Sequence, residues 1–402
     1  LSVFGRTVAN ETEALSAIYP YAAAAAAAGV TLGTVVGMIY LFILYKVKGD
    51  NITKSELAAA PRPEKSSVVA KKLITFAIPV VASSLVFSIT NLIDAITIQN
   101  RLEHMIVNNM DYIRNLYSVE LANVLDADVK NFLYGAYSLS LDFKNLIPSI
   151  TMPLGISAIP ALSAAWAIKN KKQIKVSIES VLRVTMIIAM PCGIGMGVLA
   201  QPILAAFYGS GNSAAGISIA APVMAVYGYS IFLMALSQPM TNMLQALDRA
   251  KIPLISLSLG AIAKLVANYI LVAIPSINVN GAVIGTIICY AIIVIINLGA
   301  LIFTAKIKLN FISVFIKPAF CGVLCGLAAY TSFGLCNRFI PEFQLAGHSL
   351  KTILCLGVGI GFGGLVYLIS MLLIKGIAKD DVNMLPKGEK IAKILAKYGF
   401  IE

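Results

Sequence analysis

Nine long apolar stretches run through this chain, and they limit its fold more than any other feature. They cover residues 18–45, 73–98, 131–167, 177–200, 213–247, 252–274, 280–305, 311–336 and 350–374. A helix of about 20 apolar residues is long enough to cross the hydrocarbon core of a bilayer. Only 12% of the residues are charged, whereas about a quarter are charged in an ordinary soluble domain. The sequence therefore predicts an all-α, polytopic helical membrane protein with about nine transmembrane helices.

Basic residues alternate between the segments that join these stretches. The segments 46–72, 168–176, 248–251, 306–308 and 375–402 contain 21 Lys and Arg residues, whereas the alternate segments contain 6. Cytoplasmic loops of membrane proteins carry an excess of Lys and Arg. We therefore expect a multi-pass protein with a cytoplasmic C-terminus. The net charge of +12 then reflects loop orientation, and no nucleic-acid partner is expected.

The segment 46–72 is polar, basic and proline-containing, which predicts a cytoplasmic linker. The loop 99–130 is expected outside, with a short amphipathic helix. After the last stretch, Lys387 to Lys397 has the spacing of an amphipathic helix that lies on a membrane surface. An odd number of spans with Leu1 outside predicts that preceding spans are missing from the chain.

Four ionisable residues lie inside the apolar stretches and away from their cytoplasmic ends: Asp94, Asp142, Lys144 and Lys264. An isolated charge near the bilayer centre costs about 2.5 to 3.5 kcal/mol on insertion scales, so such side chains usually face a polar cavity or a partner. This pattern is typical of a transporter.

Helical spacing groups several polar residues with these charges. Asn91, Asp94 and Arg101 are three and seven residues apart, which places them on one face of the second helix. We expect that face to line a cavity. Lys264 lies near the membrane midplane, and Asn268 follows four residues later on the same face.

Asp142 and Lys144 are two residues apart, so they point in different directions and each needs a partner on another helix. An alternative role for Lys264 is structural. In that interpretation it pairs with Asp94 or Asp142 only to hold helices together.

Two local features of the helices are also expected. Glu179 and Arg183, four residues apart, have the spacing of an ion pair within one helix. Prolines 148, 153 and 160 in the third stretch, with Pro191, Pro222 and Pro239 in others, predict interrupted or kinked helices of the kind that alternating-access transporters use.

The sequence contains no recognisable catalytic or metal-binding constellation. It lacks a GxxxxGK[ST] phosphate loop and an HExxH motif, and it has only two histidines. Its six cysteines lack CxxC spacing and are interpreted as small core residues. We expect no enzyme activity, no cofactor and no metal.

Several segments resemble one known family when taken in order. They are NLIDAITIQNRL (91–102), MPLGISAIPALSAAWA (152–167), SIESVLRVTMIIAMPCGIGMGVLAQPILAAFYG (177–209), PMTNMLQALDRAKIPLISLSLGAIAKLVANYILV (239–272) and NGAVIGTIICYAIIVIINL (280–298). The chain resembles the polysaccharide-biosynthesis, stage V sporulation protein B-like branch of the multidrug/oligosaccharidyl-lipid/polysaccharide flippase superfamily, which is related to the lipid II flippase. The likeness extends from about residue 22 to residue 398.

The resemblance implies two six-helix lobes around a central cavity, followed by two extra helices. On that template, residues 1–45 contain the last helix of an incomplete N-terminal lobe and residues 46–72 the cytoplasmic linker. Residues 73–305 form the complete C-terminal six-helix lobe, residues 306–376 two additional transmembrane helices, and residues 377–402 a basic amphipathic cytoplasmic tail.

The resemblance also implies a function. It is the movement, by alternating access, of an undecaprenyl-pyrophosphate-linked saccharide from the cytoplasmic to the outer leaflet of a bacterial cell membrane. Its partners would be this lipid-linked substrate, membrane lipids, a sodium or proton coupling ion and the missing N-terminal lobe. The expected substrate-binding residues are Asn91, Asp94, Arg101, Asp142, Lys144, Lys264 and Asn268, with the three cations facing the pyrophosphate.

Three other functions stay open at this stage. In a cation-coupled multidrug exporter of the same superfamily, Asp94 and Asp142 would bind protons or sodium. A membrane glycosyltransferase or polymerase would need paired carboxylates and a metal motif, which the 99–130 loop lacks. A non-transporting scaffold for wall synthesis is the third.

Overall fold

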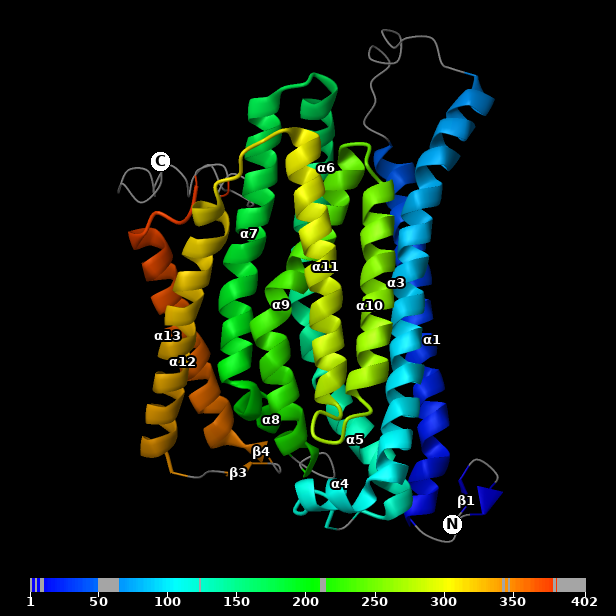
Figure 1. Cartoon of the computed structure of the whole chain (residues 1–402), viewed down its shortest axis with the longest axis vertical. Coiled ribbons are helices and arrows are strands. Elements are labelled where there is room, and N and C mark those ends of the chain that lie inside the picture. The colour runs from blue at the N-terminus through cyan, green and yellow to red at the C-terminus, as the bar shows by residue number, and fades with distance from the viewer. Residues whose placement is uncertain are drawn as a thin grey trace. The chain divides into compact units, whose positions relative to one another are not determined.

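The computed structural model of the chain describes residues 2–3, 6–7, 11–49, 65–122, 124–209, 215–341, 344–345, 348–378 and 381. These residues form an all-α membrane protein, whose helices are shown in Figure 1. Two compact units are present, Leu1–Lys71 and Lys72–Glu402.

The helices of the chain are α1 (Glu11–Lys48), α3 (Ser66–Asn108), α4 (Met110–Leu116), η1 (Asp126–Asp128), α5 (Val129–Ser138), α6 (Leu141–Ala167), α7 (Lys171–Val198), α8 (Ala200–Tyr208), α9 (Ile217–Ala246), α10 (Lys251–Leu271), α11 (Asn280–Ala305), η3 (Ile312–Ile316), α12 (Lys317–Phe339) and α13 (Leu350–Leu373). Strands are limited, among the described residues, to two short antiparallel pairs, β1 (Ser2–Val3) with β2 (Arg6–Thr7) and β3 (Gln344–Leu345) with β4 (His348–Ser349).

Nine helical segments of the described chain are long and apolar enough to cross a membrane, which confirms the predicted number. The expected short helix in the outer loop is also present as α4, although α3 extends further than predicted, to Asn108. The predicted amphipathic helix at 387–397 and most of the linker at 46–72 lie outside the described residues.

The third predicted span is two helices, because the chain turns between α5 and α6 at Leu139 and Ser140. The Ser140 hydroxyl donates to the carbonyl oxygen of Tyr137 at 2.7 Å, so this backbone group keeps a partner inside the protein.

Of the interruptions or kinks predicted at prolines, the interruptions are wrong. Helix α6 continues through its three prolines, α7 through Pro191, and α9 through Pro222 and Pro239. A proline removes one backbone donor, and neighbouring groups can satisfy the carbonyl that loses its partner. Pro239 leaves the carbonyl oxygen of Ala235, four residues earlier on α9, without its usual donor, and the Thr151 hydroxyl of α6 lies 3.2 Å from that oxygen.

Helices α7 and α9 form the centre of the Lys72–Glu402 unit. Their most apolar stretches are 56% and 67% buried, against 6% for α3. The two helices meet at glycines, since a Cβ on Gly228 would come within 2.6 Å of the Gly197 backbone nitrogen and 2.7 Å of the Gly193 carbonyl oxygen. Small residues allow this close backbone approach, which stabilises helix pairs in lipid.

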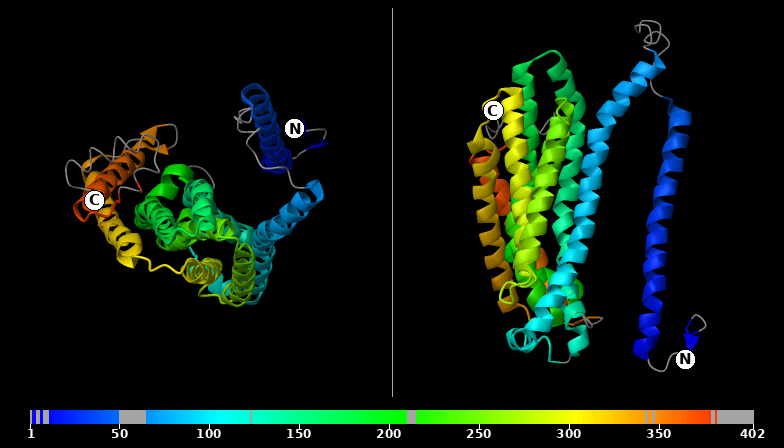
Figure 2. Two further views of the ribbon diagram at one scale, coloured as in Figure 1. Left: turned by 90° about the horizontal axis from the view of Figure 1, so that it is seen from above. Right: turned by 45° about the vertical axis from the view of Figure 1, so that its right-hand side comes forward.

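The other helices pack around this centre in pairs. Helices α10 and α11 pack together, as do α12 and α13, and α12 also lies against α7. Figure 2 shows α12 and α13 on one side of the α7 and α9 centre, and α10 with the adjoining part of α3 on the other.

A buried ion pair fastens the segment after α13 to α7. Asp381 accepts hydrogen bonds from Arg183 at 2.5 and 2.9 Å, from the Ser180 hydroxyl at 2.5 Å and from the Ala378 backbone nitrogen at 2.8 Å. The predicted pair between Glu179 and Arg183 is therefore wrong. Glu179 instead accepts from the backbone nitrogen of Asn310 and lies 3.7 Å from Lys175. The carboxylate that Arg183 binds is 198 residues away in sequence, which local spacing does not reveal.

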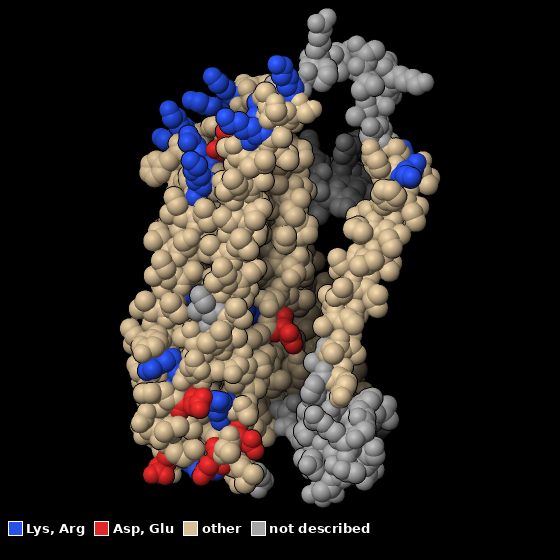
Figure 3. Space-filling model, turned by 90° about the vertical axis from the view of Figure 1, so that its right-hand side faces the viewer, with Lys and Arg blue, Asp and Glu red and all other residues tan. Residues whose placement is uncertain are grey.

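Charges separate toward the two ends of the bundle. The turns after α6, α9 and α11 lie at one end in Figure 1, and those after α10 and α12 lie at the opposite end. Figure 3 shows Lys and Arg gathered at one end of the Lys72–Glu402 unit and most Asp and Glu toward the other, with an almost uncharged belt between them. This distribution is typical of a protein that spans a bilayer.

Candidate functional site

Three of the predicted site residues meet between α3 and α10. Lys264 forms an ion pair with Asp94, and the Asn268 amide nitrogen donates to the other carboxylate oxygen of Asp94 at 2.9 Å. Lys264 and Asn268 lie one turn apart on α10, as predicted, so both reach the same partner. The Lys264 side chain is 5% exposed and that of Asp94 is 15% exposed. Lys264 therefore does not project onto the outer surface of the bundle.

This ion pair is the arrangement that the structural interpretation of Lys264 predicted. Both oxygens of Asp94 have a donor, so the carboxylate is neutralised and hydrogen-bonded within the protein. A buried charge with one partner removed is strongly unfavourable.

A close approach between α10 and α11 surrounds Asn268. A Cβ on Gly285 would lie only 2.1 Å from the Asn268 amide oxygen, so only glycine fits there without a shift of the amide. In the described part of the chain, that oxygen has no hydrogen-bond partner although the residue is 1% exposed. The position of Asn268 is thus set by Asp94 on one side and by the α11 backbone on the other.

A small cavity adjoins the pair. Its volume is about 20 Å³, and its lining includes Asn91 and Thr90 from α3, Lys264 from α10 and Tyr290 from α11. This volume is enough for about one water molecule. Asn91 therefore faces Lys264, as its shared face with Asp94 predicted, but no substrate headgroup fits in this space.

Arg101 binds the end of α10. Its Nε donates to the Tyr269 carbonyl oxygen at 3.1 Å, and its guanidinium lies 4.1 Å from the centre of the Tyr269 ring. The last carbonyl groups of a helix have no partner within the helix, and a cation there also interacts favourably with the helix dipole. Arg101 thus caps α10 and stacks on an aromatic face.

Lys144 is the candidate cation with the fewest partners. Its ammonium group lies 5.2 Å from the centre of the Tyr227 ring, and it is close enough to Asp94 and Lys264 to interact electrostatically with both. Among the described residues it forms no ion pair. The cluster of Asp94, Lys144 and Lys264 therefore carries one uncompensated positive charge.

Asp142 lies apart from this cluster. It points away from Lys144, as the two-residue spacing predicted, and accepts a hydrogen bond from the Tyr208 hydroxyl of α8 at 3.3 Å. Burial and the nearby Asp142 carboxylate raise the pKa of Tyr208 above its ordinary value, so this donor keeps its proton over a wider pH range.

Sequence reasoning missed the tyrosine beside Lys144 and the second tyrosine that holds it. The hydroxyl groups of Tyr137 and Tyr227 lie 3.0 Å apart, and both side chains are buried. Tyrosines inside apolar stretches are a usable signal, because a buried hydroxyl normally finds a polar partner. The ring that Lys144 contacts is thus fixed in position by a second tyrosine.

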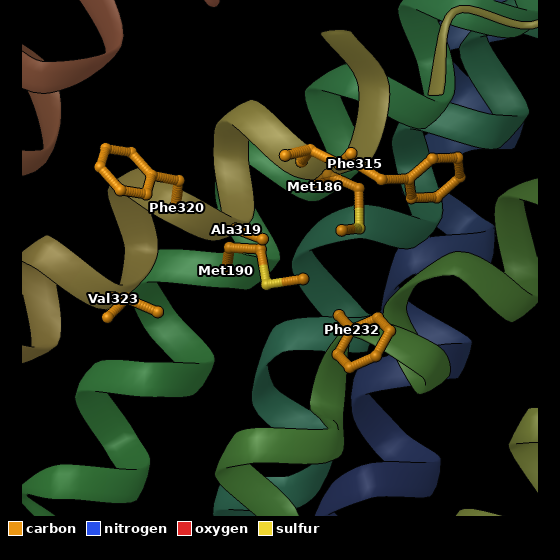
Figure 4. A pocket seen from close by; sticks show the side chains of 8 residues that line it. Met186, Met190, Phe232, Phe315, Ala319, Phe320 and Val323 are labelled. Atoms are coloured by element: carbon orange, nitrogen blue, oxygen red, sulfur yellow. The ribbon is translucent and has the colours of Figure 1, made fainter. Parts of the chain in front are cut away.

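An apolar groove lies elsewhere in the unit, between α7, α9 and the η3–α12 segment. Its volume is about 370 Å³, and Figure 4 shows the side chains of Met186, Met190, Phe232, Phe315 and Phe320 around it. The lining carries no ionisable group, so this groove cannot bind an anion by charge.

No cluster of three or more His, Cys, Asp or Glu side chains suited to a metal ion is present within the described residues. The polar groups that converge at the α3–α10 site are ammonium, carboxylate, amide and phenol. Such a set can bind ions and form hydrogen bonds.

Residues 3–348 match the model of a known protein family, described as lipid II flippase MurJ. The chain belongs to the MurJ lipid II flippase family. This membership agrees with the flippase superfamily that the sequence motifs resemble, and it makes the chain a multi-pass protein of the bacterial cell membrane.

Three curated relatives come from Bacillus subtilis (strain 168). The chain is 23% identical to the uncharacterized membrane protein YabM over 94% of this chain and 64% of YabM. It is 21% identical to stage V sporulation protein B over 91% of this chain and 64% of that protein. It is 25% identical to lipid II flippase MurJ over 36% of this chain and 26% of MurJ. The chain thus spans less than two thirds of the length of the first two relatives.

A solved structure of a MOP superfamily transporter from Pyrococcus furiosus is similar to this chain, and the alignment covers 80% of this chain and 67% of the transporter chain. The identity is 14% and the TM-score is 0.38.

Proposed function

We propose that this chain acts in a membrane flippase that moves an undecaprenyl-pyrophosphate-linked saccharide from the cytoplasmic to the outer leaflet by alternating access. The match of residues 3–348 to the MurJ family carries the proposal. In this proposal the Lys- and Arg-rich end of the bundle, with the C-terminus, faces the cytoplasm.

We assign the binding of the pyrophosphate to Lys144. The other two candidate cations already have partners, since Lys264 pairs with Asp94 and Arg101 caps α10. Lys144 rests on an aromatic ring and forms no ion pair within the described chain. A half-buried ammonium without a counter-ion attracts an anion strongly, because water screens the charge poorly there.

Lys264, Asp94 and Asn268 act in this proposal by positioning α10 against α3. Lys264 is buried to a degree that leaves little surface for a lipid headgroup. Its charge still adds to the positive potential around Lys144.

The same contacts argue against the cation-coupled exporter with Asp94 as its ion site. A sodium ion would have to displace the Lys264 ammonium and the Asn268 amide from the carboxylate. Asp142 remains the more accessible carboxylate, because it is exposed and has one tyrosine donor. A sodium or proton coupling site at Asp142 is compatible with the flippase proposal.

The test is transport by the purified chain in liposomes, with a fluorescent undecaprenyl-pyrophosphate-linked sugar as the probe. We expect Lys144→Met to weaken the apparent affinity for the probe by about ten- to a hundredfold, the value of one charge-assisted hydrogen bond. Lys317→Met is the matched control, since Lys317 bonds to the Lys375 carbonyl oxygen far from the site.

Failure of the wild-type chain to move the probe faster than protein-free liposomes contradicts the proposed function for this chain. Movement that is equally fast in the Lys144 variant contradicts only the role of Lys144.

A further inference from the structure

Helices α12 and α13 form an antiparallel pair whose backbones approach closely along the seam. A Cβ on Gly363 would lie 2.9 Å from the Ala329 side chain and 3.0 Å from the Cys325 carbonyl oxygen. One turn nearer the α12–α13 connection, a Cβ on Gly359 would lie 3.2 Å from the Ala329 carbonyl oxygen and 3.3 Å from the Phe333 side chain. These contacts fix the register of the pair.

The same register brings two cysteines together. Cys355 lies one turn before Gly359 on α13, so its neighbour on α12 falls one turn beyond Phe333, where Cys336 is located. The Cys336 and Cys355 side chains are close enough to interact electrostatically. Disulfide formation needs Cα atoms about 4.4 to 6.8 Å apart, and helices packed through glycine can come that close.

Both cysteines lie near the ends of their helices. Cys336 is three residues before the end of α12, and Cys355 is five residues after the start of α13. These positions correspond to about 5 and 8 Å along the helix axes. Arg338 and Lys351, which flank the pair, place it at the level of charged side chains. Cys336 is partly exposed, whereas Cys355 is buried.

We propose that Cys336 and Cys355 form a redox-active pair that closes to a disulfide between α12 and α13. The end of the bundle that holds them is opposite to the Lys- and Arg-rich end, so it is extracytoplasmic in the orientation proposed above. Disulfides form and persist in that compartment.

The oxidant is a disulfide, either in an oxidoreductase or in a small molecule. The Cys336 thiolate attacks one sulfur of this disulfide, forming a mixed disulfide and releasing one thiolate. The Cys355 thiolate then attacks the Cys336 sulfur, which completes the cross-link and releases the second thiolate. The two protons lost by the cysteines are taken up by the two released thiolates, so one disulfide is reduced for each one formed.

The cross-link would join the outer ends of two helices whose inner ends are already tied. At the inner end, the Lys317 ammonium donates to the Lys375 carbonyl oxygen at 2.9 Å, and Asp381 binds Arg183. A disulfide at the other end would make α12 and α13 a single rigid element.

The test uses the purified full chain in detergent with glutathione disulfide as the oxidant. The protein is then unfolded, its free thiols are blocked with a maleimide, and the peptides are identified by mass spectrometry without reduction. We expect a linked peptide containing Cys336 and Cys355 that disappears on reduction and is lost in Cys336→Ser. Cys289, buried at the α10–α11 interface, is the matched control and should remain a blockable thiol.

Two results would overturn the proposal. One is that Cys336 and Cys355 both remain open to maleimide after oxidation and unfolding. The other is that Cys336 links to several cysteines without preference, since this would show that contact in the folded pair does not direct the reaction. Neither result depends on transport, so the proposed function is tested separately.

Discussion

Lys264 of α10 forms an ion pair with Asp94 of α3, and both side chains are largely buried inside the Lys72–Glu402 unit. Asn268 completes the arrangement by donating to the second oxygen of Asp94. The two residues of the pair are 170 positions apart in sequence. Their ion pair thus connects α3 and α10 within the membrane-spanning part of the unit. Because little water reaches the pair, each charge depends on the other.

The first prediction concerns the energy of this pair. Asp94→Asn and Lys264→Met should each destabilise the folded chain by about 3 to 5 kcal/mol, because each leaves one buried charge without its partner. The double variant should recover much of the loss, since no charge then remains uncompensated. Chemical unfolding of the purified chain in detergent measures all three.

The control for this prediction is Glu103→Gln on the same helix. Glu103 pairs with Lys130 at an exposed site, where an ion pair contributes about 0 to 1 kcal/mol. A double variant that is as unstable as the sum of the two single variants would show that the pair is not coupled.

Spacing along single helices predicted part of the candidate site correctly. The shared faces of Asn91 with Asp94 and of Lys264 with Asn268 are confirmed, because residues three or four apart on a helix point the same way. Contacts between helices were beyond this reasoning. Sequence alone left open whether Asp94 or Asp142 pairs with Lys264. It also did not predict that Arg101 caps a helix.

The second prediction follows from the contact between Arg101 and the end of α10. Arg101→Gln should destabilise the last turn of α10 by about 1.5 to 3 kcal/mol, because a charged donor to a carbonyl group is lost together with a stacking contact. Hydrogen exchange of backbone amides at residues 266–272 measures the effect. Faster exchange is expected there, with little change in α7.

Arg114→Gln is a suitable comparison, since Arg114 also bonds to backbone carbonyls, those of Leu121 and Val124, but outside α10. If both variants increase exchange in α10 equally, the Arg101 contact has no specific role in capping that helix.

The third prediction tests the orientation of the chain. The Lys and Arg count predicts that Ser66 lies on the cytoplasmic side and Asn109 on the outer side. Single cysteines at these positions, in a chain freed of its native cysteines, should differ in labelling by an impermeant maleimide in intact cells. Asn109→Cys should be labelled, and Ser66→Cys only after the cells are opened. The reverse pattern would invert the proposed topology.

The number of spans was predictable because each membrane helix satisfies its own backbone and must be apolar over a fixed length. The boundary between α5 and α6 was not predictable from the sequence. Both sides of the turn at Leu139 are apolar, and the turn is stabilised by a serine–backbone hydrogen bond. The helix interruptions predicted at prolines were wrong, because sequence alone does not show which groups replace the missing backbone donor. Contacts with other helices, such as the one from Thr151 to Ala235, compensate for the missing backbone donor.

The last prediction concerns the pair between Arg183 and Asp381, which the sequence interpretation assigned to Glu179. Asp381→Asn should lower the stability of the α12–α13 pair against α7 by about 3 kcal/mol or more, because the buried Arg183 guanidinium would lose its counter-ion. Arg183→Met should have a similar effect, and combining it with Asp381→Asn should restore part of the stability. Limited proteolysis after α11, near Lys306 and Lys308, reports the release of the helix pair. Glu179→Gln, which alters a partly exposed contact in the same region, should leave the cleavage rate close to that of the wild type. Equal cleavage of Asp381→Asn and Glu179→Gln would mean that the helix pair is held by apolar packing alone, and that the buried ion pair contributes no net attachment.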